Sequence, residues 1–210
     1  MRAVSYLIAG VLLVLSTLAC ANRQTVMVPP RIDLKPHEMI GVVEFDSSSD
    51  GELGPLATRR FTESARRDQG LVRVVSIGSS DEALRSVGRT KWDAETFRAL
   101  GREHGVETIV VGNLSVSDIR PNIRIDRSLR SGSLSAQVGA ELDVQMIETA
   151  TGASIWNNSG SASQSVGHVS VFGGKDFVFD AEDPESAYGG LIDTLISQVT
   201  SDFHVRWERR

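Results

Sequence analysis

The stretch 93–114, DAETFRALGREHGVETIVVGNL, joins a capped helix to a buried strand. Asp93 is a favoured N-cap residue, apolar side chains then recur at helical spacing, and Gly105 is the residue type that most readily ends a helix. Residues 106–114 are mostly apolar and β-branched, which is typical of a central strand. We therefore expect a helix over 94–104 that runs directly into a strand of a covered sheet.

The residues before this stretch repeat the same order of elements. Residues 39–45 are an apolar run that predicts a buried strand, and 71–77 predict a second one. Between them, residues 53–65 carry apolar side chains at helical spacing, and Gly70 lies just beyond the expected helix. Strands that alternate with helices in this way predict an α/β fold with a parallel or mixed sheet.

The second half of the chain is dominated by alternating strands. From 134 to 146 every second residue is apolar, which predicts a long strand with one covered face. The chain turns at 149–152 into a partner strand from 154, and 122–127 can pair with the long strand as well. A helix over 184–207 closes the domain. The expected fold class is α/β (α+β): a mixed sheet flanked by helices, with β-hairpin insertions and a C-terminal helix.

Single residues in these strands also carry predictions. Trp156 follows Ile155 on a strand, so the two side chains point to opposite faces of the sheet. We expect a helix to cover both faces there and Trp156 to be buried. Gly112 and Gly152 are expected to be required by the fold, because glycine permits turns and close backbone approach.

Two segments, 117–142 and 157–180, are candidates for hairpins that contact a partner or a membrane. The first carries a concentration of arginines, which is either a solvated turn or a partner contact. The second turns at 173–174 and has an apolar stripe that either faces lipid or folds onto the protein's own core or a neighbouring molecule. The candidate interaction residues are Arg124, Arg127, Arg130, Val169, Val171, Phe172, Phe177 and Phe179.

The N-terminal residues predict export. Residues 1–19 contain an apolar run that is too short to span a bilayer and is followed by Cys20, the only cysteine. Leu18, Ala19 and Cys20 resemble the lipobox of bacterial lipoproteins, which implies a diacylated thiol on Cys20 that holds the protein at a membrane. Ala21, where aspartate would signal retention, then implies an outer-membrane lipoprotein that faces the periplasm. The alternative is an ordinary signal peptide followed by an unused cysteine.

The rest of the chain is expected to form one linker and one domain. Residues 20–37 begin with the lipidated cysteine and contain prolines, which favours a short extended linker. Residues 38–207 have the length and composition of a single domain with its own core.

Composition and motifs argue against several classes of function. A formal net charge of −5 without a basic run lacks the electrostatic footprint of nucleic-acid binding. The four histidines have no metal-ligand spacing, and no Gly-x-Ser-x-Gly motif marks a hydrolase serine. The acidic residues of 180–185 are either a solvated helix start or ligands of a calcium ion. We expect no catalytic residue and no cofactor.

Three segments in order, 40–45, 99–114 and 142–155, resemble the CsgG family of curli-secretion outer-membrane lipoproteins. The shared pattern is a strand, then a helix end that leads into a Val-Val-Gly strand, then a strand that ends in Thr-Gly before its partner. The resemblance implies a non-enzymatic protein that self-associates as a ring, contacts other envelope proteins and lends hairpins to a secretion channel. LpoB-type lipoproteins have similar segments and imply a periplasmic activator of a peptidoglycan synthase instead. A hydrolase is the third alternative.

Overall fold

The computed structural model describes residues 25–125, 132–167, 170–172, 176–179 and 181–209. The chain divides into two compact units. One is Pro30–His204, which contains the sheet and its helices. The described part of the other consists of 25–29 and 205–209. There, strand β1 (Thr25–Val28) pairs antiparallel with strand β10 (Arg206–Arg209).

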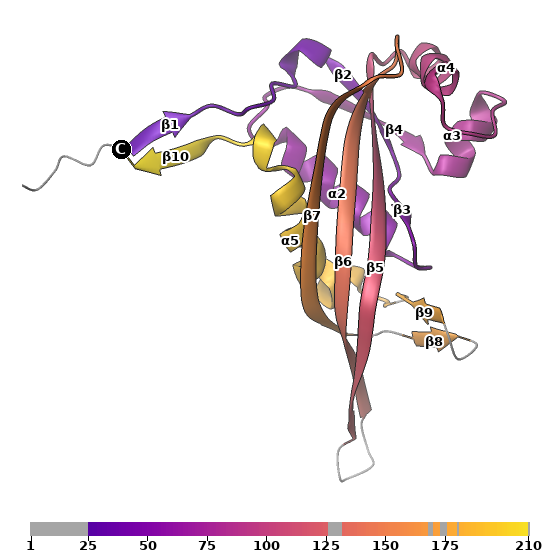
Figure 1. Cartoon of the computed structure of the whole chain (residues 1–210), viewed down its shortest axis with the longest axis vertical. Helices are drawn as coiled ribbons and strands as arrows, with labels where there is room; N and C mark the ends of the chain where they lie inside the picture. Colours follow the sequence, from indigo (N-terminus) through magenta and orange to yellow (C-terminus); the bar gives the residue numbers. More distant parts are fainter. Residues whose placement is uncertain (1–24, 126–131, 168–169, 173–175, 180, 210) are drawn as a thin grey trace, which may run out of the picture. The chain divides into compact units, whose positions relative to one another are not determined.

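A mixed sheet organises the larger unit, as the sequence predicts (Figure 1). Its strand order is β4-β2-β5-β6-β7. The first three of these strands run parallel and the last three antiparallel, and the two-residue strand β3 also pairs with β5. The bounds are β2 (Met39–Val43), β3 (Asp46–Ser47), β4 (Arg73–Gly78), β5 (Thr108–Ile125), β6 (Gly132–Glu148) and β7 (Ser154–Gly167).

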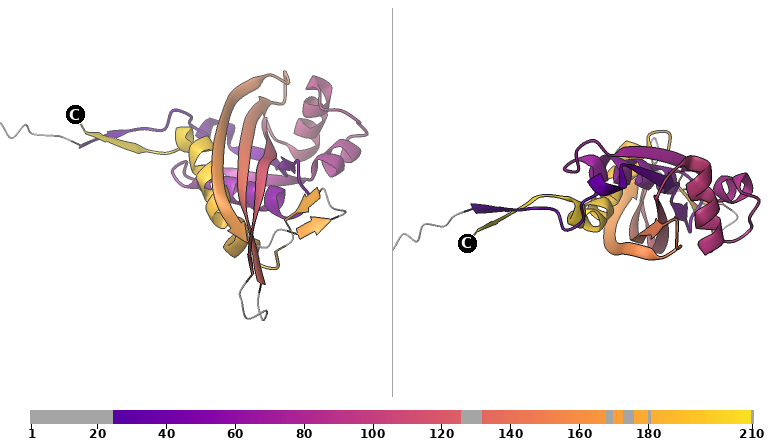
Figure 2. Two further views of the ribbon diagram at one scale, coloured as in Figure 1. Left: turned by 60° about the horizontal axis from the view of Figure 1, so that its bottom comes forward. Right: turned by 90° about the horizontal axis from the view of Figure 1, so that it is seen from above.

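Helices pack on both faces of this sheet but cover them unequally (Figures 1 and 2). The helices α2 (Leu53–Arg66) and α5 (Pro184–Val199) bury Val110 and Leu114 of β5 in the larger apolar cluster. Ile109, on the other side of β5, belongs to a smaller cluster with α3 (Ser80–Ser86) and α4 (Ala94–His104). Successive strand residues point to opposite faces, so the two clusters lie on opposite sides of the sheet.

The ends of α4 confirm the interpretation of the stretch from which the sequence analysis starts. The Asp93 carboxylate accepts the backbone N–H of Thr96 at 2.9 Å, which satisfies a donor that the first helical turn leaves free. Gly105 ends the helix in the left-handed region, with φ of 64°. Helix α3 was not anticipated, although Ser79 and Glu82 form a capping box at its start.

The C-terminal helix is shorter than the predicted 184–207. It ends at Val199, is followed by the 3-10 turn η2 (Ser201–Phe203), and the chain is extended again in β10. The Thr200 hydroxyl donates back to the carbonyl of Ile196 at 2.7 Å, a local bond that competes with helix continuation. The turn places the Phe203 ring in the core, with its centroid 4.6 Å from that of Trp156.

Trp156 is buried, as predicted. The prediction that helices cover both faces of the sheet at this point is wrong. Trp156 is 8% exposed and Ile155 is 45% exposed. The ladder shifts here, because Trp156 pairs with Met146 but Ser154 pairs with Ile147, which leaves Ile155 as the extra residue of a β-bulge. Because the bulge interrupts the regular alternation at Ile155, the Ile155 side chain does not have to pack against either face of the sheet.

The segment 117–142, predicted as a hairpin insertion, is the continuation of the central ladder. The pairing of β5 with β6 runs from Thr108↔Glu148 to Ile125↔Gly132, with one irregularity after Ser117. Strand β7 leaves this ladder earlier, at Ser135↔Gly167. Beyond β7, the short strands β8 (Ser170–Phe172) and β9 (Asp176–Val178) pair antiparallel, which agrees with a hairpin around 173–174, although 173–175 lie outside the described residues.

Part of the expected linker is structured. Leu34 is 3% exposed, and its backbone N–H donates to the side-chain carbonyl of Gln69 at 2.7 Å. The 3-10 turn η1 (Lys35–His37) follows it before β2 begins. Residues 1–19 and Cys20 lie outside the described residues. Within the described ranges, no helix has the length and apolar content that a bilayer crossing requires.

Gly112 offers a test of the core. A Cβ at this position would lie 2.6 Å from the Phe45 ring, too close for the packed interior to accept without movement. We expect Gly112→Ala to lower the free energy of unfolding by about 1–3 kcal/mol in urea denaturation. The matched control is Gly189→Ala in α5, where the nearest atom to the new Cβ, the far end of Glu185, is 3.7 Å away. The control should gain up to about 1 kcal/mol of helix propensity. Equal stabilities of the two variants would contradict the close approach of Gly112 to Phe45.

Candidate binding surface on the open face of the sheet

One face of the β5–β6–β7 sheet is polar and uncovered over most of its length. The apolar cluster under α3 and α4 reaches this face at Ile109, Val111 and Ile147, near one end of the strands. Beyond that end, the outward side chains are polar and exposed or half-buried. The open face consists of Asn113, Ser115 and Ser117 of β5, Glu141, Asp143 and Gln145 of β6, and Asn157, Ser159 and Ser161 of β7.

The alternation in β6 produces this face. The residues of β6 that point toward α5, from Ala136 to Met146, are between 0% and 4% exposed. The intervening residues Glu141, Asp143 and Gln145 are exposed. A strand has a side-chain period of two, so burial of one set fixes the other set on the opposite face. The open face is therefore held in place by the main core.

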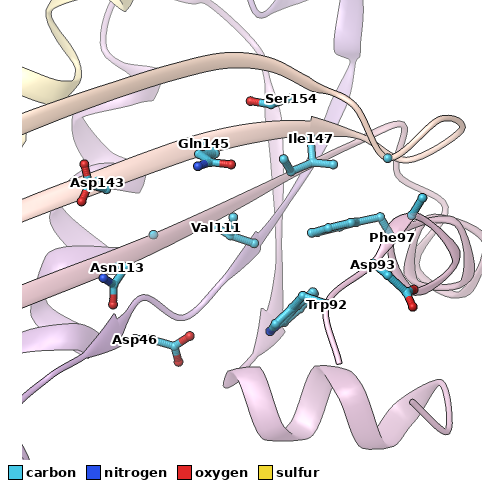
Figure 3. A pocket seen from close by; sticks show the side chains of 13 residues that line it. Asp46, Trp92, Asp93, Phe97, Val111, Asn113, Asp143, Gln145, Ile147 and Ser154 are labelled. Carbon is cyan, nitrogen blue, oxygen red and sulfur yellow. The ribbon is translucent and has the colours of Figure 1, made fainter. Parts of the chain in front are cut away.

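A cavity of about 490 Å³ lies where the open face meets α4 and the residues before it (Figure 3). The Trp92 ring stacks on Phe97, with centroids 5.2 Å apart and planes inclined by 30°. Figure 3 shows the side chains of Asp143 and Gln145 projecting from the neighbouring strand β6. The cavity thus combines an aromatic wall with hydrogen-bonding groups, a combination typical of small-molecule and peptide sites.

The charge of this cavity is negative. Asp46, Asp93 and Asp143 are among its lining residues, and none of the described lining residues is basic. Hydrogen bonds from the backbone N–H and the hydroxyl of Thr96 hold the pKa of Asp93 below its ordinary value. Asp46 accepts a hydrogen bond from the Ser80 hydroxyl at 2.8 Å. The carboxylates and amides can accept hydrogen bonds from a polar ligand whose apolar side stacks on Trp92.

A further carboxylate, Glu44, lies among other acidic groups at the end of β2. Burial raises its pKa above the ordinary 4.5, and the nearby negative charges of Glu82, Glu52 and Asp46 raise it further. A raised carboxyl pKa means that ionisation is less favourable in the folded chain than in the unfolded chain. Glu44 therefore costs stability at neutral pH.

The edge of β7 is closed by a side chain of α5. The amide of Gln198 accepts the backbone N–H of Ser161 at 2.9 Å and donates to the carbonyl of the same residue at 3.0 Å. This pair of bonds imitates the contact that a further strand would make. It blocks that part of the β7 edge, a usual way of protecting edge strands from unwanted pairing.

Ser64, His204 and Asp68 form a chain of contacts on the other side of the domain. The Ser64 hydroxyl oxygen lies 3.0 Å from Nε2 of His204, and Nδ1 of His204 lies 3.1 Å from an oxygen of Asp68. The order resembles a hydrolase triad. However, Ser64 is only 7% exposed, lies within α2 and also contacts the Thr200 hydroxyl at 2.9 Å. The arrangement accounts well for a polar connection between α2 and the chain after α5.

The predicted interaction residues are only partly within the described chain. Arg124 pairs with Ser133 in the β5–β6 ladder, whereas Arg127, Arg130 and Val169 lie outside the described residues. Val171, Phe172 and Phe177 belong to β8 and β9, and Val171 pairs with Phe177.

Phe179 is a core residue and not part of an exposed hairpin face. Strand β9 ends at Val178, and the Phe179 side chain is 0% exposed, with its ring centroid 5.4 Å from that of Tyr188. Its carbonyl accepts the backbone N–H of Glu52 at 2.9 Å. The sequence pattern predicts that Phe177 and Phe179 share one face of a strand. This prediction is wrong because the strand ends at Val178, between the two residues.

Two of the acidic residues in 180–185 have structural roles. Asp183 caps α5 by accepting the backbone N–H of Ser186 at 3.2 Å, and Glu185 binds Arg59 and Arg60. Burial raises the pKa of Glu185, but the arginine hydrogen bonds outweigh burial and hold the pKa below its ordinary value. Among the described side chains, which exclude Asp180, no group of three or more His, Cys, Asp or Glu could hold a metal ion.

The sequence analysis assigned Asp93, Gly112 and Gly152 to the fold and did not predict that they line a cavity. Asp46, Trp92 and Asn113 come from three separate segments, and only the pairing of β3 with β5 and the position of α4 bring them together. The signal for the open face was nevertheless present. Apart from Gly139, every second residue of β6 from 133 to 145 is polar, and serines and asparagines dominate 157–165.

No protein-family model matches the chain, and no curated protein matches it. Similar solved structures include a PelC dodecamer from Paraburkholderia phytofirmans, with 12% identity, a TM-score of 0.44, and coverage of 88% of this chain and 99% of that chain. The LpoB C-terminal domain from Salmonella enterica has 14% identity, a TM-score of 0.37 and coverage of 65% and 86%. A lipoprotein from Neisseria meningitidis has 18% identity, a TM-score of 0.35 and coverage of 60% and 83%. Thus the predicted CsgG family finds no matching model, the related LpoB domains are among the similar structures, and none of these similarities assigns a function.

Glu44 gives a pH-dependent prediction. Because its pKa is raised in the folded chain, the stability associated with this group is fully present below about pH 4.5 and is lost as the pH rises through the folded pKa. Glu44→Gln should therefore raise the melting temperature at pH 7 and lose this advantage at pH values below 4.5. Glu103→Gln removes an exposed carboxylate of α4 and is the control, with no such pH-dependent gain expected. A gain for Glu44→Gln that is equal at both pH values would contradict the electrostatic explanation.

Proposed function

We propose that this protein is a non-catalytic outer-membrane lipoprotein, anchored by a diacylated Cys20 with its domain in the periplasm. It acts in envelope assembly or protein export through protein contacts, as a subunit of an oligomer. The lipobox-like Leu18-Ala19-Cys20 supports the anchor. The structural observation that supports an oligomer is the end of the β5–β6 ladder, which projects beyond the rest of the sheet.

This projecting end, the distal hairpin, is a two-stranded ribbon without lateral support. Beyond Ser135↔Gly167 the described chain contributes no third strand, yet β5 and β6 stay paired as far as Ile125↔Gly132 (Figure 1). An isolated pair of strands is marginally stable in water, and its free edges are templates for another strand. A long ladder that continues past its own sheet is therefore best explained by a neighbouring molecule that pairs with it or covers it.

The open face provides a second surface suited to protein contact. Interfaces between proteins that also exist apart are about as polar as the rest of a protein surface. The serines and amides of the open face can hydrogen-bond to a partner, and the Trp92 cavity offers a place for an anchoring side chain. Because the main core fixes these side chains, little ordering is required when a partner binds.

A short tether favours action close to the anchoring membrane. The packed unit begins at Pro30, so the chain between Cys20 and this unit is roughly 10 residues and spans at most about 35 Å. An LpoB-type regulator that reaches a synthase in the opposite membrane would need a longer tether. This length supports contacts with neighbours in the same membrane.

The oligomer is tested by shortening the distal hairpin. Residues 122–135 are replaced with an Asn-Gly turn, which closes the ladder near Pro121↔Ala136 and leaves the helices and the rest of the sheet in place. We expect detergent-extracted wild-type protein to be a large particle in size-exclusion chromatography with light scattering, and the shortened variant to be a folded monomer. A monomeric wild type would contradict the oligomer and favour the regulator. Unchanged assembly of the shortened variant would show that the hairpin does not carry it.

The absence of catalysis is tested at Ser64. We expect no reaction of Ser64 with a fluorophosphonate probe in intact folded protein, because the side chain is 7% exposed and its hydroxyl also contacts Thr200. Ser64→Ala should cost about 1–3 kcal/mol in unfolding free energy, because it leaves the buried partners of the hydroxyl unsatisfied. Labelling of Ser64 that disappears in His204→Ala would overturn the non-catalytic proposal and identify a hydrolase.

A further inference from the structure

The pairing of β1 with β10 joins residues 25–28 to residues 206–209 in a separate two-stranded ribbon, the terminal ribbon. Its register places Met27 opposite Trp207 and Thr25 opposite Arg209. Since strand residues alternate between faces, these two pairs share one face. The other face carries Val26, Val28, Arg206 and Glu208.

The first of these faces exposes an unusual amount of apolar surface. The Met27 side chain is 54% exposed and Trp207 is 67% exposed, although they lie directly opposite each other. A two-stranded ribbon alone is marginally stable in water. Covering this cross-strand pair would stabilise the ribbon, so the face is suited to contact with an apolar surface.

The position of the ribbon in the chain indicates which surface covers it. Thr25 follows Cys20 by five residues, and such a segment spans at most about 17 Å. If the thiol of Cys20 carries lipid, the N-terminal strand of the ribbon cannot leave the neighbourhood of the bilayer surface. Pairing keeps the C-terminal strand there as well.

The side chains have the chemistry of the membrane–water interface. Tryptophan has an apolar ring and a polar N–H, and it is enriched at the level of the lipid headgroups. Residues 206–210 contain three arginines and one glutamate, so the segment around Trp207 is basic. Arginines near anionic headgroups are attracted to the membrane surface.

We propose that the terminal ribbon docks on the lipid surface, with Met27 and Trp207 inserted at the headgroup level. This inference rests on the proposed lipidation of Cys20 and adds a second membrane contact to it. The covering surface is lipid and not a second copy of the ribbon, because the anchor places the bilayer within reach of every copy of the chain. The ribbon then holds residues 25–28 and 206–209 at the bilayer.

The test uses full-length protein purified in detergent and reconstituted into vesicles of phosphatidylethanolamine and phosphatidylglycerol. Trp92→Phe and Trp156→Phe leave Trp207 as the only tryptophan, which is excited selectively at 295 nm, and circular dichroism verifies that this variant folds. Brominated lipids, with bromine either close to the headgroup or deep in the acyl chain, then quench by contact. We expect Trp207 to lose most of its intensity with the shallow bromine and less with the deep one.

A matched pair of variants tests the contribution of the ribbon to binding. Met27→Ser combined with Trp207→Ser removes the apolar pair, whereas Leu71→Ser removes another fully exposed apolar side chain that lies outside the ribbon. We expect the double variant to lose protection of residues 25–28 and 206–209 in hydrogen exchange on vesicles, and the Leu71 variant to retain it.

The outcomes separate this inference from the proposed function. Mass spectrometry of the N-terminal peptide reports acylation of Cys20, and Cys20→Ser should release the protein from washed membranes. Acylated protein whose Trp207 is not quenched by either lipid overturns the ribbon contact alone. Trp207 emission that is shielded only at high protein concentration, without quenching by lipid, assigns the face to a second copy and also overturns it. Quenching in unacylated protein would keep the ribbon contact and refute the anchor.

Discussion

The burial of one side of β6 is the constraint on which the rest of the larger unit depends. Its inward residues from Ala136 to Met146 are at most 4% exposed and pack in the cluster that α2 and α5 cover. Full burial of a valine or leucine side chain contributes about 1.5–3 kcal/mol to stability. A one-residue shift in the register of β6 would expose all of these side chains at once and lose each of these contributions. The same constraint orients β5 and β7 through their registers, presents the polar residues on the open face and aligns the start of the distal hairpin.

The sequence predicts this part of the fold well because its signals are local. The cap at Asp93, the left-handed Gly105 and the alternation of 134–146 each act through near neighbours, and all three are confirmed. The burial of Trp156 was also predicted correctly. Errors occur where a tertiary contact decides the local conformation. The helix ends before Phe203, because the Phe203 ring packs in the core beside Trp156. Ile155 is exposed because it lies in a β-bulge, and the periodicity of the sequence does not predict this bulge.

The candidate site was less accessible to sequence reasoning. Its aromatic wall comes from α4 and the residue Trp92 before it, and its carboxylates come from β3, β6 and the N-cap of α4, so their meeting depends on strand order. The hairpin residues were chosen by composition. Composition identifies an apolar or basic segment, but it does not tell whether a ring such as Phe179 turns into the core. The N-terminal prediction about Cys20 concerns processing, which no folded contact in the described chain reports.

The amide of Gln198 has a consequence for how the sheet can grow. Its two bonds to Ser161 occupy one point of the free edge of β7, whereas β4, at the opposite end of the strand order, has no strand beyond it in the described chain. At Ser161 an added strand is therefore excluded, whereas the β4 edge remains available for backbone pairing. A molecule that approaches β7 at Ser161 has to recognise side chains and shape instead of backbone, which makes recognition at that point sensitive to sequence.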